Sequence, residues 1–240
     1  MIVKLKKETY SGADGSSLSN DRCLQIADLY DFWLTHPGVS YKELQEAAVE
    51  ESLYSGKADS IIRTFCKLLK KLNFVDYDDA LPFVFTDMGT VFVKTHNALI
   101  EAQKEKNALL ISKLSGLKQT IIMGGIEEMS KNSDYDDHPI WVAIGLLNHF
   151  DTIDWKEHYY ALYLLYQKNL SWDEVVNNIS ENRARHIEYE VQNTEGEALA
   201  NTGYSYIRSL LLEAGLITNN KHKSTLVSAN KSFIEKINKF

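Results

Sequence analysis

The 240-residue sequence has only two cysteines and three prolines, and it has no long apolar run. Neither Cys23 nor Cys66 lies in a C-x-x-C motif or near histidines at zinc-ligand spacing, so we expect no disulfide framework and no zinc site. Both lie in apolar helical patterns, which predicts buried thiols in a reducing compartment. The sequence also has no N-terminal apolar segment, so we expect no secretion, no membrane span and a cytoplasmic location.

Motifs for common enzyme chemistries are missing too. The sequence contains no G-x-x-x-x-G-K-[ST], G-x-G-x-x-G, H-E-x-x-H or G-x-S-x-G. The nearest approach to a metal-dependent nuclease centre is Asp137 with Asp154-Trp155-Lys156. Asp154 opens a helical pattern, however, where such a centre needs a strand. We therefore predict no catalytic residue, no metal ligand and no cofactor in this chain.

Positive charge is scarce overall but concentrated in two places. The net charge is −7, which argues against nonspecific coating of nucleic acid. Residues 57–71 nevertheless carry a local charge of +4, and so do residues 208–240. Two basic islands in an acidic chain are what a segregated binding face requires.

The first part of the chain reads as three helices followed by a β-hairpin. Residues 22–36 have helical apolar spacing and end at Pro37-Gly38. Ser40 followed by Glu43 is the capping-box signature of a second helix. Residues 57–72 give a third helix with one apolar face, and two short apolar runs around the acidic turn "DYDD" give the hairpin. This order predicts a winged helix-turn-helix.

The later part of the chain repeats this plan. Ser171 and Glu174 match Ser40 and Glu43 at an offset of 131, whereas the third helices match at an offset of 142, with Gly215 on Asn73. Glycine and asparagine are the residues that best tolerate the left-handed conformation after a helix. The change in offset predicts an insertion of eleven residues between the later second and third helices.

The sequence therefore predicts a mainly α fold of two tandem winged-helix modules. Residues 1–105 form the first module, which a single long helix closes, and residues 138–240 form the second. Residues 106–137, which include a Gly-Gly pair and an acidic run, are the expected linker. Coincidental matching of amphipathic helices is the alternative to a duplicated architecture.

The third helix of such a module enters the major groove of DNA, so its outward face holds the candidate contacts. In the first module these are Lys57, Ser60, Arg63, Thr64, Lys67 and Lys70. Arg63 suits a bidentate contact to guanine, and the lysines suit phosphates. The alternative is an ordinary solvated helix face.

The matching face of the second module is much less basic. It carries Ser205, Tyr206, Arg208 and Ser209, with Lys221 and Lys223 in the following hairpin as candidate phosphate contacts. If this face binds DNA, it reads base edges more than backbone. Packing against a protein is the alternative.

Three stretches resemble a known family: "HPIWVAIGLLNHFDTIDWKEHYYALYLLYQKNLSWDEVVNNISENR", "YSYIRSLLLEAGLI" and "LPFVFTDMGTVF". They look like the target-recognition region of type IIS restriction endonucleases and nicking endonucleases. The resemblance implies winged-helix recognition subdomains joined to a metal-dependent nuclease domain, and it adds Arg183 and Arg185 as candidate DNA contacts. Because the nuclease motif is missing, this chain would be the recognition part, acting with a nuclease domain or subunit.

The sequence thus predicts specific binding of double-stranded DNA. A transcriptional regulator or replication initiator with the same fold is the first alternative, and it implies a symmetric dimer on palindromic sites. A winged-helix scaffold for protein interactions is the second, and it implies no salt-dependent DNA affinity.

Overall fold

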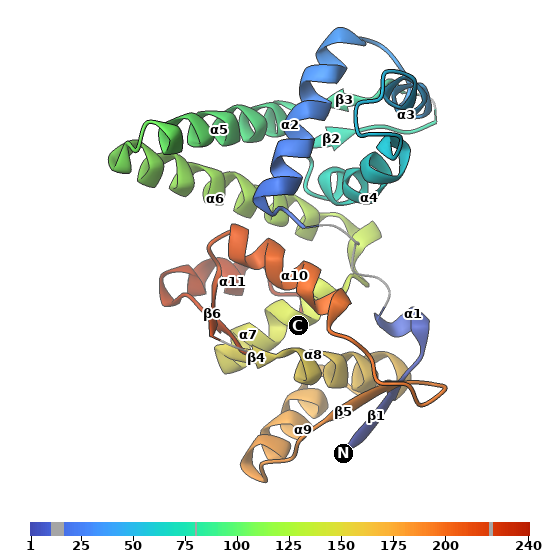
Figure 1. Ribbon diagram of the computed structural model, residues 1–240. Helices are drawn as coiled ribbons and strands as arrows, with labels where there is room; N and C mark the ends of the chain where they lie inside the picture. Colours follow the sequence, from blue (N-terminus) through green and yellow to red (C-terminus); the bar gives the residue numbers. More distant parts are fainter. Residues whose placement is uncertain (11–16, 80, 221–222) are drawn as a thin grey trace. The chain divides into compact units, whose positions relative to one another are not determined.

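The structure is a computed structural model that describes residues 1–10, 17–79, 81–220 and 223–240, without the side chain of Asn220. Most of these residues are helical and the strands are short, so a mainly α fold is confirmed (Figure 1). The contacts divide the chain into two compact units. The central unit lies within Asp14–Tyr135, and the terminal unit combines Met1–Ala13 with Asp136–Phe240. None of the described helices has the length and apolar character needed to cross a bilayer.

In the central unit, three helices are followed by a β-hairpin and a helical hairpin. The helices are α2 (Asn20–Thr35), α3 (Tyr41–Glu50) and α4 (Ala58–Lys71). Strands β2 (Val75–Asp76) and β3 (Val84–Phe85) pair antiparallel, and α5 (Asp87–Lys104), α6 (Ala108–Lys131) and the short η1 (Ser133–Tyr135) complete the unit. The apolar face predicted for α4 is buried, with Ile62, Phe65, Leu68, Leu69 and Leu72 in the core.

The single long helix expected after the β-hairpin is two helices, α5 and α6, packed against each other. Lys106 has a left-handed backbone (φ 57°), which ends the first helix. The Asn107 side chain then caps the second helix by accepting the Leu110 N–H at 3.1 Å. Because α6 fills most of residues 106–137, these residues belong to the packed unit, which differs from the linker expected there.

The Gly-Gly pair lies inside α6 and serves close packing. A Cβ on Gly125 would lie 2.9 Å from the Leu72 carbonyl oxygen, so only glycine lets α6 approach the end of α4 this closely. Gly125 is therefore a packing residue, and the pair lies within a continuous helix and not in a flexible joint.

The terminal unit contains a three-stranded sheet and a separate pair of strands. Its elements are β1 (Ile2–Leu5), α1 (Lys7–Tyr10), α7 (Pro139–Phe150), β4 (Thr152–Asp154), α8 (Trp155–Leu162), the π-helical η2 (Tyr163–Gln167), α9 (Trp172–Ala184), β5 (Glu190–Asn193), α10 (Thr202–Glu213), β6 (Ile217–Asn220), β7 (Lys223–Leu226), η3 (Ser228–Asn230) and α11 (Lys231–Ile237). The sheet order is β4-β7-β6, with both pairs antiparallel.

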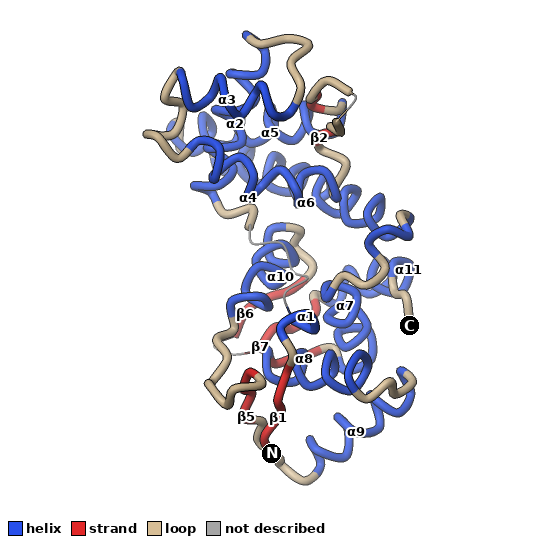
Figure 2. The backbone as a smooth tube through the Cα atoms, turned by 90° about the vertical axis from the view of Figure 1, so that its right-hand side faces the viewer, coloured by secondary structure: helices blue, strands red, loops and turns tan. Residues whose placement is uncertain are grey.

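The N-terminal strand is part of the terminal unit, although residues 1–105 were expected to form one module. Strand β1 pairs in parallel with β5, with Ile2 opposite Glu190 and Leu5 opposite Asn193 (Figure 2). Val3 and Leu5 are buried because alternate residues of a strand face the same side. Local sequence patterns do not reveal such a long-range pair.

Helices α4 and α10 end in the same way, as their alignment predicts. Asn73 (φ 58°) and Gly215 (φ 68°) both adopt the left-handed conformation. In both turns the N–H of the next residue, Phe74 or Leu216, donates to the carbonyl five residues earlier, at 2.8 and 2.9 Å. These are the bonds of a Schellman motif, which satisfies carbonyls at a helix end.

The predicted capping boxes at Ser40 and Ser171 are both present. Strand pairing nevertheless changes which helices correspond. Ser40, just before α3, bridges to Pro82 in the hairpin of its unit. In the terminal unit it is β4, just before α8, that pairs with the hairpin strand β7.

By this pairing α8 corresponds to α3, and the prediction that α9 does so is wrong. Asp154 caps α8 in a capping box with Glu157, as the matching element requires. The additional segment of the terminal unit is therefore η2, α9 and β5, and not eleven residues after α9.

We predict opposite effects of alanine at two glycines of α6. Gly125→Ala should lower the free energy of unfolding by about 2 kcal/mol, because the new methyl group meets the Leu72 carbonyl. Gly116→Ala should raise it by about 0.5–1 kcal/mol, because no described heavy atom lies within 4 Å of a Cβ placed there and alanine favours helix. Urea denaturation of both variants measures this. Equal effects would mean that α6 does not pack closely on α4.

We also predict acid sensitivity from buried histidines. Burial lowers the pKa of His96 and of His158 to about 4. Since the folded state disfavours the protonated rings, their contribution to stability is complete above the ordinary histidine pKa of about 6.5 and is lost as pH falls toward about 4.

The test uses His96, because neither of its ring nitrogens has a hydrogen-bond partner in the described part of the chain. His96→Leu should be nearly neutral at pH 8 and should reduce the loss of stability between pH 6.5 and 4.5. Urea midpoints across this range measure the slope. An unchanged slope would contradict the assignment.

Candidate nucleic-acid interface

Helix α4 presents a compact polar face opposite its buried apolar face. Ser60, Arg63 and Lys67 follow one another at helical spacing and are exposed, as is Lys57 at the N-terminal end. A guanidinium and an ammonium one turn apart can contact base edges and phosphates together.

Two other residues of the predicted face are engaged within the unit. Thr64 is half-buried, and its hydroxyl donates to the Ser60 carbonyl at 2.6 Å. The Lys70 ammonium donates to the Tyr77 carbonyl, lies 3.4 Å from an Asp76 carboxylate oxygen and stands 4.7 Å from the centre of the Tyr77 ring. Lys70 therefore links α4 to the β-hairpin. The exposed residues of the predicted face are Lys57, Ser60, Arg63 and Lys67.

The hairpin that follows α4 is acidic. Asp76, Asp78 and Asp79 are exposed, and Asp78 accepts the Leu81 N–H at 2.7 Å. Carboxylates at this position repel phosphate, so any DNA contact of the central unit depends on α4 and not on its hairpin.

In the terminal unit, the residues predicted on α10 are all half-buried: Ser205, Tyr206, Arg208 and Ser209. The Ser205 hydroxyl donates to the Thr202 carbonyl at 2.6 Å. Lys223 is exposed at the start of β7, and Lys221 lies outside the described residues. The α10 face thus offers one cation, Arg208, among neutral side chains.

The two arginines carried over from the family resemblance lie in very different surroundings. Arg183 donates to both carboxylate oxygens of Glu157 at 2.8 Å and to the Thr152 carbonyl at 2.7 Å, and it stands 4.2 Å from the centre of the Phe150 ring. Arg185 is exposed and lies 3.7 Å from a Glu181 oxygen one turn away.

Arg183 therefore has a structural role, and its role as a DNA contact stays a prediction. It joins α9 to the capping box of α8, since Glu157 also accepts the Asp154 N–H at 3.0 Å. The D-x-x-E spacing of Asp154 and Glu157 was readable in the sequence, but its partner on another helix was not.

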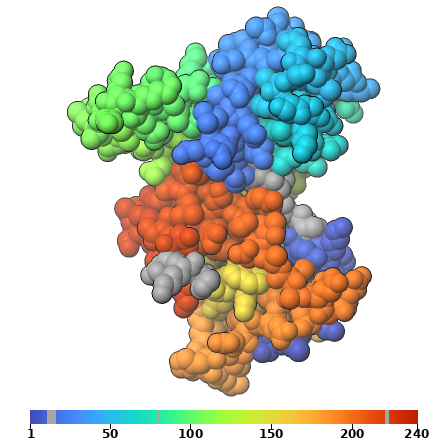
Figure 3. All heavy atoms as spheres, in the orientation of Figure 1, coloured from blue at the N-terminus to red at the C-terminus, as the bar shows by residue number. Residues whose placement is uncertain are grey.

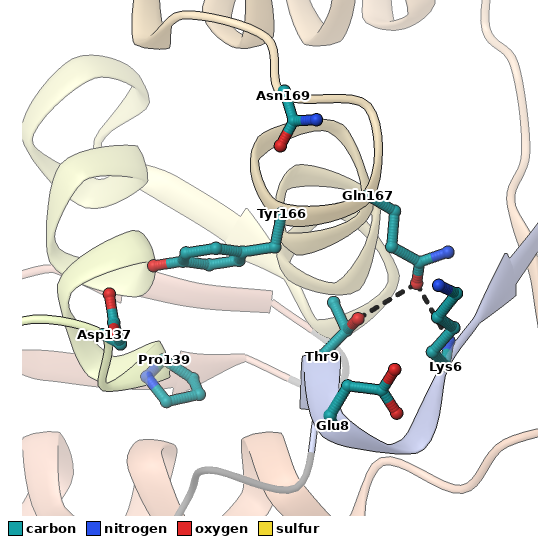
Figure 4. Close-up of a pocket in the computed structure, with 8 residues that line it drawn as sticks. All are labelled: Lys6, Glu8, Thr9, Asp137, Pro139, Tyr166, Gln167 and Asn169. Atoms are coloured by element: carbon teal, nitrogen blue, oxygen red, sulfur yellow. Dashed lines mark hydrogen bonds between the residues drawn. The ribbon is translucent and has the colours of Figure 1, made fainter.

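A pocket of about 490 Å³ in the terminal unit was not predicted from the sequence (Figure 4). Gln167, one of the residues that line it, accepts the Lys6 N–H at 2.8 Å and the Thr9 hydroxyl at 3.1 Å, and donates to the Lys4 carbonyl at 3.2 Å. These bonds tie the N-terminal segment to the π-helix η2, so the amide is structural.

No group of three histidine, cysteine or acidic side chains among the residues that the structure describes could hold a metal ion. Both cysteines are buried free thiols, as expected, and burial raises the pKa of Cys66.

Comparison of the chain with family models, with curated proteins and with solved structures found no match. The geometry of α4 and its surroundings is therefore the basis for any functional proposal.

We predict that the two arginines differ in their effect on stability. Arg183→Ala should lower the free energy of unfolding by about 2 kcal/mol, because Glu157 loses a half-buried charged partner. Arg185→Ala should change it by less than about 0.5 kcal/mol, since exposed ion pairs contribute little. Thermal unfolding measures the midpoint temperature of each variant. Equal midpoints would contradict the structural role assigned to Arg183.

Proposed function

We propose that this protein binds a specific sequence in double-stranded DNA through α4. The observation that carries the proposal is the exposed set of Ser60, Arg63 and Lys67 on a third helix whose other face is buried. Three helices followed by an antiparallel hairpin is the order of a winged helix-turn-helix, in which this helix enters the major groove.

The side chains of α4 suit two different kinds of DNA contact. Arg63 can donate two parallel hydrogen bonds to guanine, whereas Lys57 and Lys67 suit the phosphates on either side. In the terminal unit, Tyr206 and Ser209 of α10 offer polar groups with little charge, so this helix would discriminate between bases more than it attracts the backbone.

Two biological roles fit this activity. The family resemblance favours target recognition for a restriction endonuclease, with catalysis supplied by a nuclease domain or subunit. Exposed leucines on α6 favour the second role, a transcriptional regulator or replication initiator that works as a dimer on a two-fold symmetric site.

The test of DNA binding removes the two central cations. A selection from random duplexes identifies the bound sequence, and fluorescence anisotropy measures affinity for it at several salt concentrations. Arg63→Ala with Lys67→Ala should weaken binding by about 10–100-fold and should reduce the salt slope by about two.

The matched control is Lys94→Ala with Lys106→Ala, which removes the same charge from exposed positions away from α4. It should leave both affinity and salt slope close to those of the unchanged protein. Unchanged binding in the α4 variant would overturn the assignment of this helix. An absence of salt-dependent affinity in the unchanged protein would favour a protein-interaction scaffold instead.

A further inference from the structure

Helix α6 carries a second apolar stripe beside the one that packs in the core. Buried Ile122, Ile126 and Met129 face the rest of the central unit. The second stripe consists of Leu110, Leu114, Leu117, Ile121 and Gly124, which we call the α6 seam. Leu110 is 38% exposed and Leu117 is 45% exposed, and the other three are half-buried. The space-filling view shows that the tip of the α5–α6 hairpin, drawn in green, projects well beyond α2 of the same unit (Figure 3).

The spacing of the seam is that of a coiled coil. Its members are separated by four, three, four and three residues, the heptad pattern that keeps one apolar line facing a partner helix. Scattered exposed leucines need no explanation, but a continuous heptad line on a helix that already has its own core face does.

We propose that the α6 seam pairs with the same seam of a second copy of this chain, antiparallel about a two-fold axis near Gln119. In that register Leu117 of each copy meets Ile121 of the other, and Leu114 of each copy meets Gly124 of the other. Leu110 lies at the end of the contact, where it faces Glu128 of the partner. A Cβ on Gly124 would lie 3.8 Å from the Met88 methyl carbon of α5, an ordinary van der Waals distance, so the partner's leucine would pack on the glycine backbone and on Met88 together.

The charges beside the seam select this direction. The same register brings exposed Lys113 of each copy opposite Glu127 of the other. The dimer would therefore contain two ion pairs, each between one lysine and one glutamate. A parallel pairing would give Lys113 no carboxylate partner, because the position it would face on the other copy is a lysine, Lys118.

A dimer of this kind has a consequence for DNA binding. Because α4 and α6 pack within one unit, pairing through α6 relates two α4 helices by a two-fold axis. A two-fold particle matches a two-fold symmetric DNA site. The pairing itself rests on α6 alone and does not depend on the proposed DNA binding.

Sedimentation equilibrium of the full chain without DNA, over about 1–100 μM, tests the pairing. The unchanged protein should form a dimer. Leu117→Glu should raise the dimer dissociation constant by about a hundredfold, because a carboxylate would enter the apolar seam. Leu109→Glu is the matched control, since Leu109 is 67% exposed on the same helix but lies off the seam, and it should leave the dimer intact. A monomer throughout this range, or a dimer that resists Leu117→Glu, would overturn the proposal.

A charge exchange tests the direction. Lys113→Glu alone and Glu127→Lys alone should each weaken the dimer by about tenfold, because each creates two like-charge contacts. The double variant should restore it. Because Glu127 also lies 3.3 Å from Lys131 in its own helix, circular dichroism must show that each variant keeps its helix content. Failure of the double variant to recover, with helices intact, would rule out the antiparallel register. Loss of DNA binding by the α4 variant with the dimer retained would leave this inference standing.

Discussion

The turn that ends α4 fixes the rest of the central unit. The Phe74 carbonyl accepts the Thr86 N–H at 3.1 Å, and the Asn73 carbonyl accepts the Thr86 hydroxyl at 2.6 Å, so α5 starts from this turn. On the other side, Gly125 brings α6 against the Leu72 carbonyl. Three helices therefore converge on three consecutive residues. The polar face of α4 and the α6 seam are held in one geometry because both are anchored at this point.

The terminal unit has the same kind of turn after α10, but the exposed face of α10 differs from that of α4. The Gly215 carbonyl accepts the Asn230 side-chain amide at 2.9 Å, and the Leu216 carbonyl accepts the Val227 N–H at 2.9 Å. The buried framework is thus repeated, whereas the cations on α4 have no counterparts on α10 beyond Arg208. Repetition of the framework constrains the backbone, and it leaves the exposed faces free to differ.

Sequence reasoning succeeded where the signal was local. The capping boxes, the buried face of α4 and the left-handed residues Asn73 and Gly215 each depend on a few neighbouring residues. It failed where a partner lay far along the chain. The β1–β5 pair and the match between α8 and α3 depend on strand pairing, and the break at Lys106 has no glycine or proline to announce it.

The candidate site shows the same division. The exposure of Arg63 and Lys67 follows from helical periodicity, so these residues could be found in the sequence. Lys70 and Arg183 looked equally suitable, but the Tyr77 carbonyl and the Glu157 carboxylate hold them. A few exposed cations beside an acidic hairpin would release few counterions on binding DNA, so a single α4 would give limited affinity. In the proposed dimer, a second α4 would bind the same duplex at high effective concentration, which would compensate for the small number of contacts in each copy. The acidic composition and the DNA-binding proposal are therefore compatible if the two-fold particle is the binding species.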